Sequence, residues 1–183
     1  MNAKRKMIIS ITALGVVLLA AIVAVVAVLA AQSVTIKSSI NVSYNADKII
    51  GTVTAQYQVK NCEATNIGAG SWTFYGNETG TDATKEGSAT NIVLSETNNY
   101  VDFIFTFTND GDAAYTATLN LPESAKVVNL TITYVTLPDS VNADNLSFTV
   151  AKDTTETYKI RYSISNNDLD AKIDNSSFEW TLA

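Results

Sequence analysis

The chain has 183 residues, no histidine and a formal net charge of −6. The absence of histidine excludes Ser-His-Asp and Cys-His nucleophile systems, histidine-containing zinc sites and metalloprotease helices of the H-E-x-x-H type. Past residue 32 the chain has nine basic residues against 18 acidic ones, and a charge of −9 excludes nucleic acid as a partner. The sequence therefore predicts a protein that is not an enzyme and has no catalytic, cofactor-binding or metal-binding residues.

The first feature along the chain is an almost unbroken apolar run at residues 7–31, MIISITALGVVLLAAIVAVVAVLAA, after a basic flank at residues 1–6. Twenty-five residues at ~1.5 Å each make a helix of roughly 37 Å, which is long enough to cross a hydrocarbon core of ~30 Å. Lys4, Arg5 and Lys6 predict a cytoplasmic N-terminus, with residues 32–183 outside the membrane. Small residues at the end of the run leave a second reading open, in which the segment is a cleaved signal peptide and the domain is secreted.

Beyond residue 33 the apolar residues recur with a period of two, which is typical of antiparallel strands with one buried and one wet face. The intervening residues are mostly Thr, Ser, Asn, Asp and Lys. The main alternating sets are Val34, Ile36, Ile40, Val42 and Tyr44; Ile49, Val53, Ala55, Tyr57 and Val59; Val101, Phe103, Phe105 and Phe107; Tyr115, Ala117, Leu119 and Leu121; Val128, Leu130, Ile132 and Tyr134; Leu146, Phe148 and Val150; Tyr158, Ile160, Tyr162 and Ile164; and Phe178, Trp180 and Leu182.

With weaker runs at 72–75 and 92–94, the pattern predicts nine or ten strands and no helix after residue 32. Many short strands of this kind pack as two sheets face to face. We therefore expect an antiparallel β-sandwich, immunoglobulin-like or jelly-roll, formed by one domain over residues 32–183. Residues 76–90, GNETGTDATKEGSAT, are polar and contain glycine, which predicts a mobile loop.

Three local features of the sequence are candidate sites. Cys62 has no partner within the chain, and its position near a strand end predicts a partly buried structural cysteine. The loops at 109–112 and 166–170 are rich in Asn and Asp, which suits calcium, but neither has the EF-hand spacing and both favour hairpin turns. Trp72 and Phe74 share one strand parity, which predicts core filling, whereas Tyr75 is expected to face outward.

The basic start, the long apolar segment and the wholly β exported domain resemble small Gram-positive surface proteins of the camelysin/TasA type. Two segments carry the likeness, VDFIFTFTNDGDAAYTATLNL and YKIRYSISNNDLDAKIDNSSFEWTL, which look like the paired strands of such exported sandwiches. The resemblance implies a subunit of biofilm-matrix fibres. The chain departs from the group's pattern at residues 32–35, and the protease activity ascribed to camelysins is not expected without a metal-binding histidine.

The leading hypothesis is thus a structural or interaction protein of a bacterial cell surface, held in the membrane through residues 7–31. Its first strand, residues 33–44, forms an alternating ribbon that can pair with its own sheet or with the open edge of a second copy, giving self-association. The alternative hypothesis is a membrane-tethered extracellular module that binds a glycan or a partner protein through the loop at 76–90.

Overall fold

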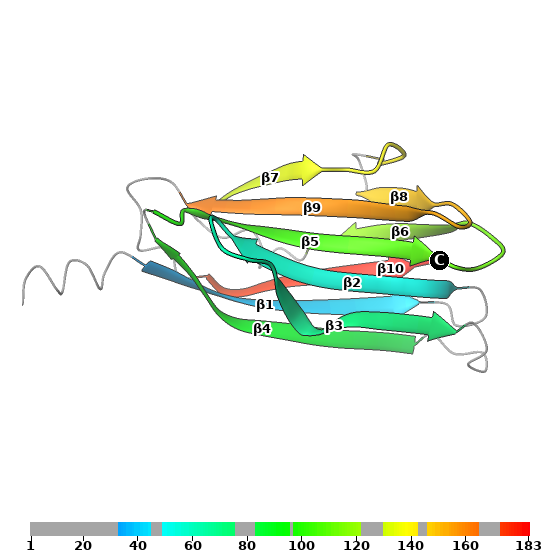
Figure 1. Cartoon of the computed structure of the whole chain (residues 1–183), viewed down its shortest axis with the longest axis horizontal. Helices are drawn as coiled ribbons and strands as arrows, with labels where there is room; N and C mark the ends of the chain where they lie inside the picture. The colour runs from blue at the N-terminus through cyan, green and yellow to red at the C-terminus, as the bar shows by residue number, and fades with distance from the viewer. Residues whose placement is uncertain are drawn as a thin grey trace, which may run out of the picture.

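The computed structural model describes residues 33–44, 49–75, 83–95, 97–121, 130–142, 146–164 and 173–183, which form two sheets (Figure 1). Sheet A has the strand order β4-β1-β10-β6-β8, and sheet B has the order β3-β2-β5-β9-β7. The ten strands are β1 Ser33–Tyr44, β2 Ile50–Val59, β3 Thr65–Tyr75, β4 Ala83–Ser95, β5 Tyr100–Asn109, β6 Tyr115–Asn120, β7 Leu130–Thr136, β8 Ser147–Val150, β9 Thr155–Ile164 and β10 Ile173–Leu182. The predicted all-β sandwich is confirmed.

Strand pairing is antiparallel throughout the described sheets except between β1 and β10, which run parallel. The start of β1 and the end of β10 therefore lie at opposite ends of the long axis (Figure 1). The predicted apolar helix at residues 7–31 lies outside the described residues. In the part of the chain that is described, no helix has the length and apolar character needed to span a membrane.

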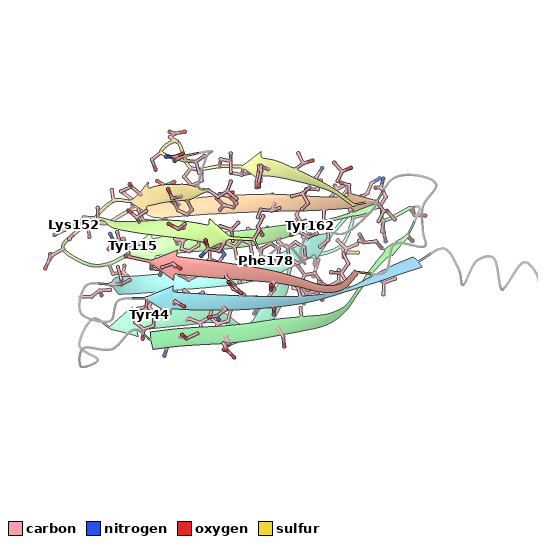
Figure 2. The ribbon with its side chains drawn as sticks, turned by 180° about the vertical axis from the view of Figure 1, so that it is seen from behind. Tyr44, Tyr115, Lys152, Tyr162 and Phe178 are labelled. Atoms are coloured by element: carbon pink, nitrogen blue, oxygen red, sulfur yellow. The ribbon has the colours of Figure 1, made fainter. Side chains whose placement is uncertain are left out.

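The core lies between the two sheets and is built from the side chains that the period of two assigned to the inner faces. Val101, Phe103, Phe105 and Phe107 on β5 are fully buried, as are Tyr158, Ile160 and Tyr162 on β9. Rings from the two sheets meet in this layer, and the Tyr162 and Phe178 centroids lie 5.9 Å apart (Figure 2). Alternation identified the buried face of these strands correctly, but on β7, the outermost strand of sheet B, Tyr134 was assigned to the same face as Ile132 and is 40% exposed.

The connections between strands mostly cross from one sheet to the other. Of the nine connections between ten successive strands, only the one from β2 to β3 joins neighbours in the same sheet. A turn sequence signals a reversal of the chain but does not say whether the next strand pairs beside the last one or across the core. The hairpin expectation for residues 109–112 is therefore wrong, because that loop joins β5 in sheet B to β6 in sheet A.

The polar stretch at residues 76–90 is shorter as a loop than the sequence predicted. β4 begins at Ala83 and runs for 13 residues, so the second half of that stretch is strand. Because β4 is the outermost strand of sheet A, polar side chains such as Thr84, Glu86 and Ser88 can remain exposed along it. Residues 76–82 lie outside the described part of the chain.

Two glycines bring the sheets together at the edge formed by β3 and β4. Gly68 has a φ of +58°, and a Cβ built on it would lie 2.6 Å from the Gly87 Cα. A Cβ on Gly87 would in turn lie 2.7 Å from the Cζ2 atom of Trp72. Only glycine permits both the left-handed backbone and this close approach, so the glycine pair closes one long edge of the sandwich.

Candidate functional site

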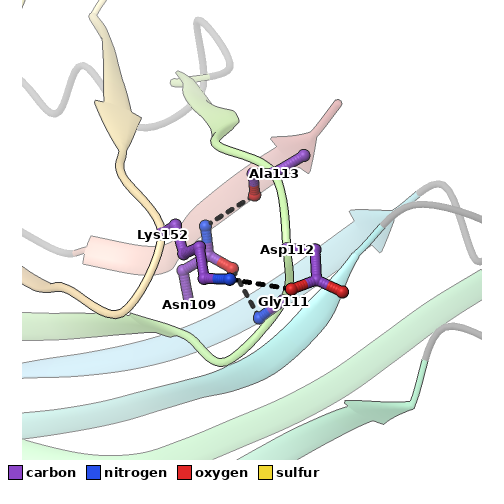
Figure 3. Close-up of polar contacts among 5 residues, drawn as sticks. All are labelled: Asn109, Gly111, Asp112, Ala113 and Lys152. Atoms are coloured by element: carbon purple, nitrogen blue, oxygen red, sulfur yellow. Dashed lines mark hydrogen bonds and ion pairs between the residues drawn. The ribbon is translucent and has the colours of Figure 1, made fainter.

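The loop after β5 is organised by the buried side chain of Asn109 (Figure 3). Its amide nitrogen donates hydrogen bonds to the carbonyl oxygens of Ala113 at 2.9 Å and Val150 at 3.0 Å. Its amide oxygen accepts a hydrogen bond from the Gly111 N–H at 2.9 Å. Three hydrogen bonds from one buried amide tie the β5–β6 loop to the end of β8, so the Asn109 side chain is structural.

Asp112, which the sequence offered as a calcium ligand, points instead to Lys152 (Figure 3). The Lys152 Nζ and the Asp112 Oδ1 lie 2.8 Å apart, and the hydrogen bond to Lys152 is the main reason that the Asp112 pKa is lowered. Among the described residues, no group of three or more acidic or cysteine side chains is arranged to hold a metal ion. The second loop, at residues 166–170, lies outside the described part of the chain.

Cys62 differs from its prediction. It lies in the turn between β2 and β3, where the sequence placed it, but its side chain is exposed rather than partly buried. Asn61 before it has a φ of +61°, and the Cys62 N–H donates a hydrogen bond to the Val59 carbonyl at 2.9 Å. This tight turn carries Cys62 past the end of the strand, so strand alternation no longer decides which way its thiol faces.

Two of the three aromatic residues before the predicted loop are confirmed as core residues. Trp72 and Phe74 are both buried, and the Phe74 ring centroid lies 4.3 Å from that of Tyr44 in the opposite sheet. The two rings fill the core under the edge closed by the glycines. The side chain of Tyr75 lies outside what the structure describes.

A polar groove of about 470 Å³ crosses the outer face of sheet A over strands β4, β1 and β10. Asn41 lies at its centre, opposite Glu86 on one neighbouring strand and Glu179 on the other. Ser39, Ser88 and Ser177 form the next row along the strands. The Asn41 Oδ1 is buried and finds no hydrogen-bond partner among the described residues. The groove offers carboxylates, hydroxyls and an amide, and none of the residues that line it is aromatic.

An ion pair on the outer face of sheet B was not found by sequence reasoning. The Arg161 guanidinium donates to both carboxylate oxygens of Asp102, at 2.7 and 2.9 Å, and lies 3.7 Å from the centroid of the Tyr100 ring. Asp102 is buried beneath it, and the hydrogen bonds raise the Arg161 pKa. Opposite charges at alternating polar positions were visible in the sequence, but their pairing depends on the β5–β9 register.

Comparisons with known proteins do not identify a family. No family model matches the sequence, and no curated protein matches it. One solved structure similar to part of the chain is the cupredoxin domain of amoB from Nitrosocaldus yellowstonii, at 10% identity and a TM-score of 0.23. The match covers 37% of this chain and 37% of that domain. Another is the envelope protein VP37 of White Spot Syndrome Virus, at 10% identity and a TM-score of 0.24, covering 63% of this chain and 84% of VP37.

Proposed function

We propose that this chain is a non-enzymatic structural or interaction protein of a bacterial cell surface, anchored or exported through residues 7–31. An exported fibre or matrix subunit is the form that we favour. The observation that carries the proposal is the position of β1. This strand follows the apolar segment directly and lies inside sheet A, bonded to β4 on one edge and to β10 on the other.

The position of β1 suits a domain that transmits force. Tension that enters at Ser33 and leaves at the end of β10 would pull the parallel pair β1 and β10 past one another along their length. Their pairing extends from Ile36 opposite Ile173 to Tyr44 opposite Leu182. Such loading acts on many hydrogen bonds together rather than opening them one at a time. This arrangement favours a structural role over a catalytic one.

The same strand supports assembly. Ile36, Ile40, Val42 and Tyr44 are almost fully buried between the sheets. At ~1.5 to 3 kcal/mol for each large apolar side chain, their burial contributes a substantial part of the domain's stability. If β1 of one copy occupied the same place in the next copy, every buried contact would be kept and the copies would be linked in a chain.

A disulfide trap tests this proposal. Ser39 on β1 lies opposite Ser88 on β4, so Ser39→Cys with Ser88→Cys in a Cys62→Ser background can form a bridge across the pair. In oxidised surface extracts, exchange of β1 between copies gives a ladder of covalent multimers on denaturing gels. Bridged monomers alone, in material that electron microscopy shows to be fibrous, would rule out β1 exchange. Absence of any fibre or matrix would reject the structural role.

The alternative function is a tethered binding module for a glycan or a partner protein, and the groove over Asn41 favours it. Two carboxylates and three serine hydroxyls can bind a ligand rich in hydroxyl groups. Glu86→Gln with Glu179→Gln should then abolish retention on a glycan array that the unmodified domain binds. Thr116→Ser with Thr149→Ser, on the same face outside the groove, is the matched control.

Two finer assignments belong to this proposal. We favour the jelly-roll form of the sandwich over the immunoglobulin-like form, because eight of the nine connections pass between the sheets. We also keep the camelysin/TasA-type resemblance, which rests on the layout of the sequence. A chain of this type is expected on the outer surface or in the matrix, and protease treatment of intact cells with a sealed membrane should digest residues 33–183.

A further inference from the structure

The two sheets end in four outer strands, and one of these differs from the other three. β4 and β8 bound sheet A, and β3 and β7 bound sheet B. An outer strand presents unpaired backbone N–H and C=O groups that can bond to a strand of another chain. How each of the four is covered therefore shows where this domain can join a partner.

Three of the outer strands are covered or charged. β3 and β4 approach each other at Gly68 and Gly87, and β4 also carries the charged residues Lys85 and Glu86. β8 is covered by the chain that follows β7. The Ser140 hydroxyl accepts a hydrogen bond from the Thr149 N–H at 3.1 Å and donates one to the Thr149 carbonyl at 3.3 Å.

β7 has no such cover among the described residues. It is bonded only to β9, and no described strand lies against its other edge (Figure 1). From Leu130 to Pro138 the sequence LTITYVTLP contains no charged residue. Of the five exposed large apolar side chains in the described structure, three lie here, with Tyr134 40%, Val135 44% and Leu137 40% exposed. Exposed apolar side chains beside an open backbone edge are the usual features of a strand that pairs with another chain.

We propose that β7 pairs antiparallel with β7 of a second copy, which joins the two B sheets into one continuous sheet. Charge favours a second copy at this place. Two copies of a domain with a charge of −9 repel each other overall, but β7 contains no charged residue along its whole length. The pairing is isologous, so it closes as a dimer.

The sequence of β7 suits pairing with itself. β7 is regular against β9 from Leu130 to Tyr134, and a bulge follows before Thr136. A two-fold axis at Ile132 sets Ile132 opposite its own copy and Thr131 opposite Thr133. Pairs of β-branched residues are favourable across antiparallel strands. Thr131 and Thr133 are exposed on the outer face, so changes there leave the core intact.

Complementary charge variants test the pairing. One variant carries Thr131→Glu with Thr133→Glu, and the other carries Thr131→Lys with Thr133→Lys. In a dimer of either variant, like charges lie opposite each other. The domain formed by residues 33–183 can be tested by itself, because the buried core residues run from Ile36 to Leu182. We expect the unmodified domain to dimerise in analytical ultracentrifugation. Each variant alone should bind itself at least roughly tenfold more weakly, and an equal mixture of the two should restore a 1:1 dimer.

Ser71→Glu with Thr73→Glu and the matching lysine pair are the controls, because they make the same changes at exposed positions of β3. These variants should dimerise as the unmodified domain does. A domain that stays monomeric at millimolar concentration, edge variants that still dimerise, or a mixture that fails to pair would each overturn the proposal. The proposal would also be overturned if the β7 edge bound an unrelated extended peptide and did not bind a second copy of the domain. The result does not depend on exchange of β1, which the disulfide trap reports separately.

Discussion

The two long edges of the sandwich are built in different ways. At the edge of β3 and β4, backbone meets backbone through Gly68 and Gly87, and Trp72 and Phe74 fill the core beneath. At the edge of β7 and β8, a loop covers β8, and no described strand pairs with the outer edge of β7. The first edge depends on glycine conformation and the second on side-chain hydrogen bonds. One edge is therefore closed by the close approach of its two strands, and the other carries the strand at which we propose association.

The largest expected effect is a loss of stability at alkaline pH, caused by buried tyrosines on the strands next to β7 and β8. Tyr115, Tyr158 and Tyr162 lie on β6 and β9, next to β8 and β7, and burial raises the pKa of each phenol. A raised folded pKa contributes stability that is complete below the ordinary value of about 10 and is lost as pH rises above it. We expect a loss of roughly 1.4 kcal/mol per tyrosine per pH unit beyond that point, measured by urea unfolding from pH 8 to 12.

Tyr162→Phe provides the control for this pH dependence. The Tyr162 hydroxyl is buried and has no hydrogen-bond partner among the described residues, so the variant should be as stable as the unmodified domain at pH 7, or more stable. Its alkaline loss should be shallower by one titrating group. An unchanged slope would show that Tyr162 ionises as readily in the folded domain as in the unfolded chain.

Asn109→Asp should destabilise the contact between the β5–β6 loop and the end of β8. A carboxylate there faces the Ala113 and Val150 carbonyl oxygens instead of donating to them, which should cost roughly 3 kcal/mol or more in the free energy of unfolding. Asn66→Asp is the control, because Asn66 is exposed and its oxygen accepts a hydrogen bond from Gln56 that an aspartate keeps. Equal losses in the two variants would contradict the structural role of Asn109.

Gly68→Ala should destabilise the contact between β3 and β4. Alanine disfavours a φ of +58°, and its Cβ would approach the Gly87 Cα to 2.6 Å, so we expect a loss of about 2 to 3 kcal/mol. Ser71→Ala, an exposed change on the same strand, should leave the thermal midpoint almost unchanged. If Gly68→Ala is tolerated as well as Ser71→Ala, the two strands do not need their close approach.

Ser140→Ala should uncover β8 at a smaller cost. The Thr149 N–H loses its acceptor, which should lower stability by about 1 kcal/mol and speed hydrogen exchange at that amide. The amide of Thr116, which bonds to the carbonyl of Ala183, serves as an internal reference. Unchanged exchange at Thr149 would mean that the Ser140 side chain does not protect this edge.

Val135→Lys should have the smallest effect on folding. Val135 on β7 and Val93 on β4 are both exposed valines on outer strands, so a lysine at either place should change monomer stability by less than about 0.5 kcal/mol. The two variants should differ in association instead, because Val135 lies on β7, which has no described strand at its outer edge, whereas Val93 lies on β4, which approaches β3. Light scattering at high concentration would detect this difference, and equal association in the two variants would remove the distinction between the edges.

The sequence by itself determined most of the buried positions and the absence of histidine-based mechanisms. Strand alternation placed Phe103, Phe105 and Phe107 in the core, and the structure confirms this because side chains on a strand alternate strictly between its two faces. Trp72 and Phe74 were assigned correctly for the same reason. The exclusion of histidine-based mechanisms also needs no coordinates, since it follows from composition.

Only the tertiary structure decided what each strand and loop pairs with. The sequence could not show that β1 lies between β4 and β10, that residues 109–112 cross between sheets, or that Arg161 meets Asp102. Cys62 was predicted as partly buried and is exposed, because a left-handed residue before it turns the chain. Period two is a local property of one strand, whereas register, sheet membership and an open edge arise from contacts between residues far apart in the chain. For the same reason the sequence LTITYVT alone does not show that β7 is the outermost of the described strands of sheet B.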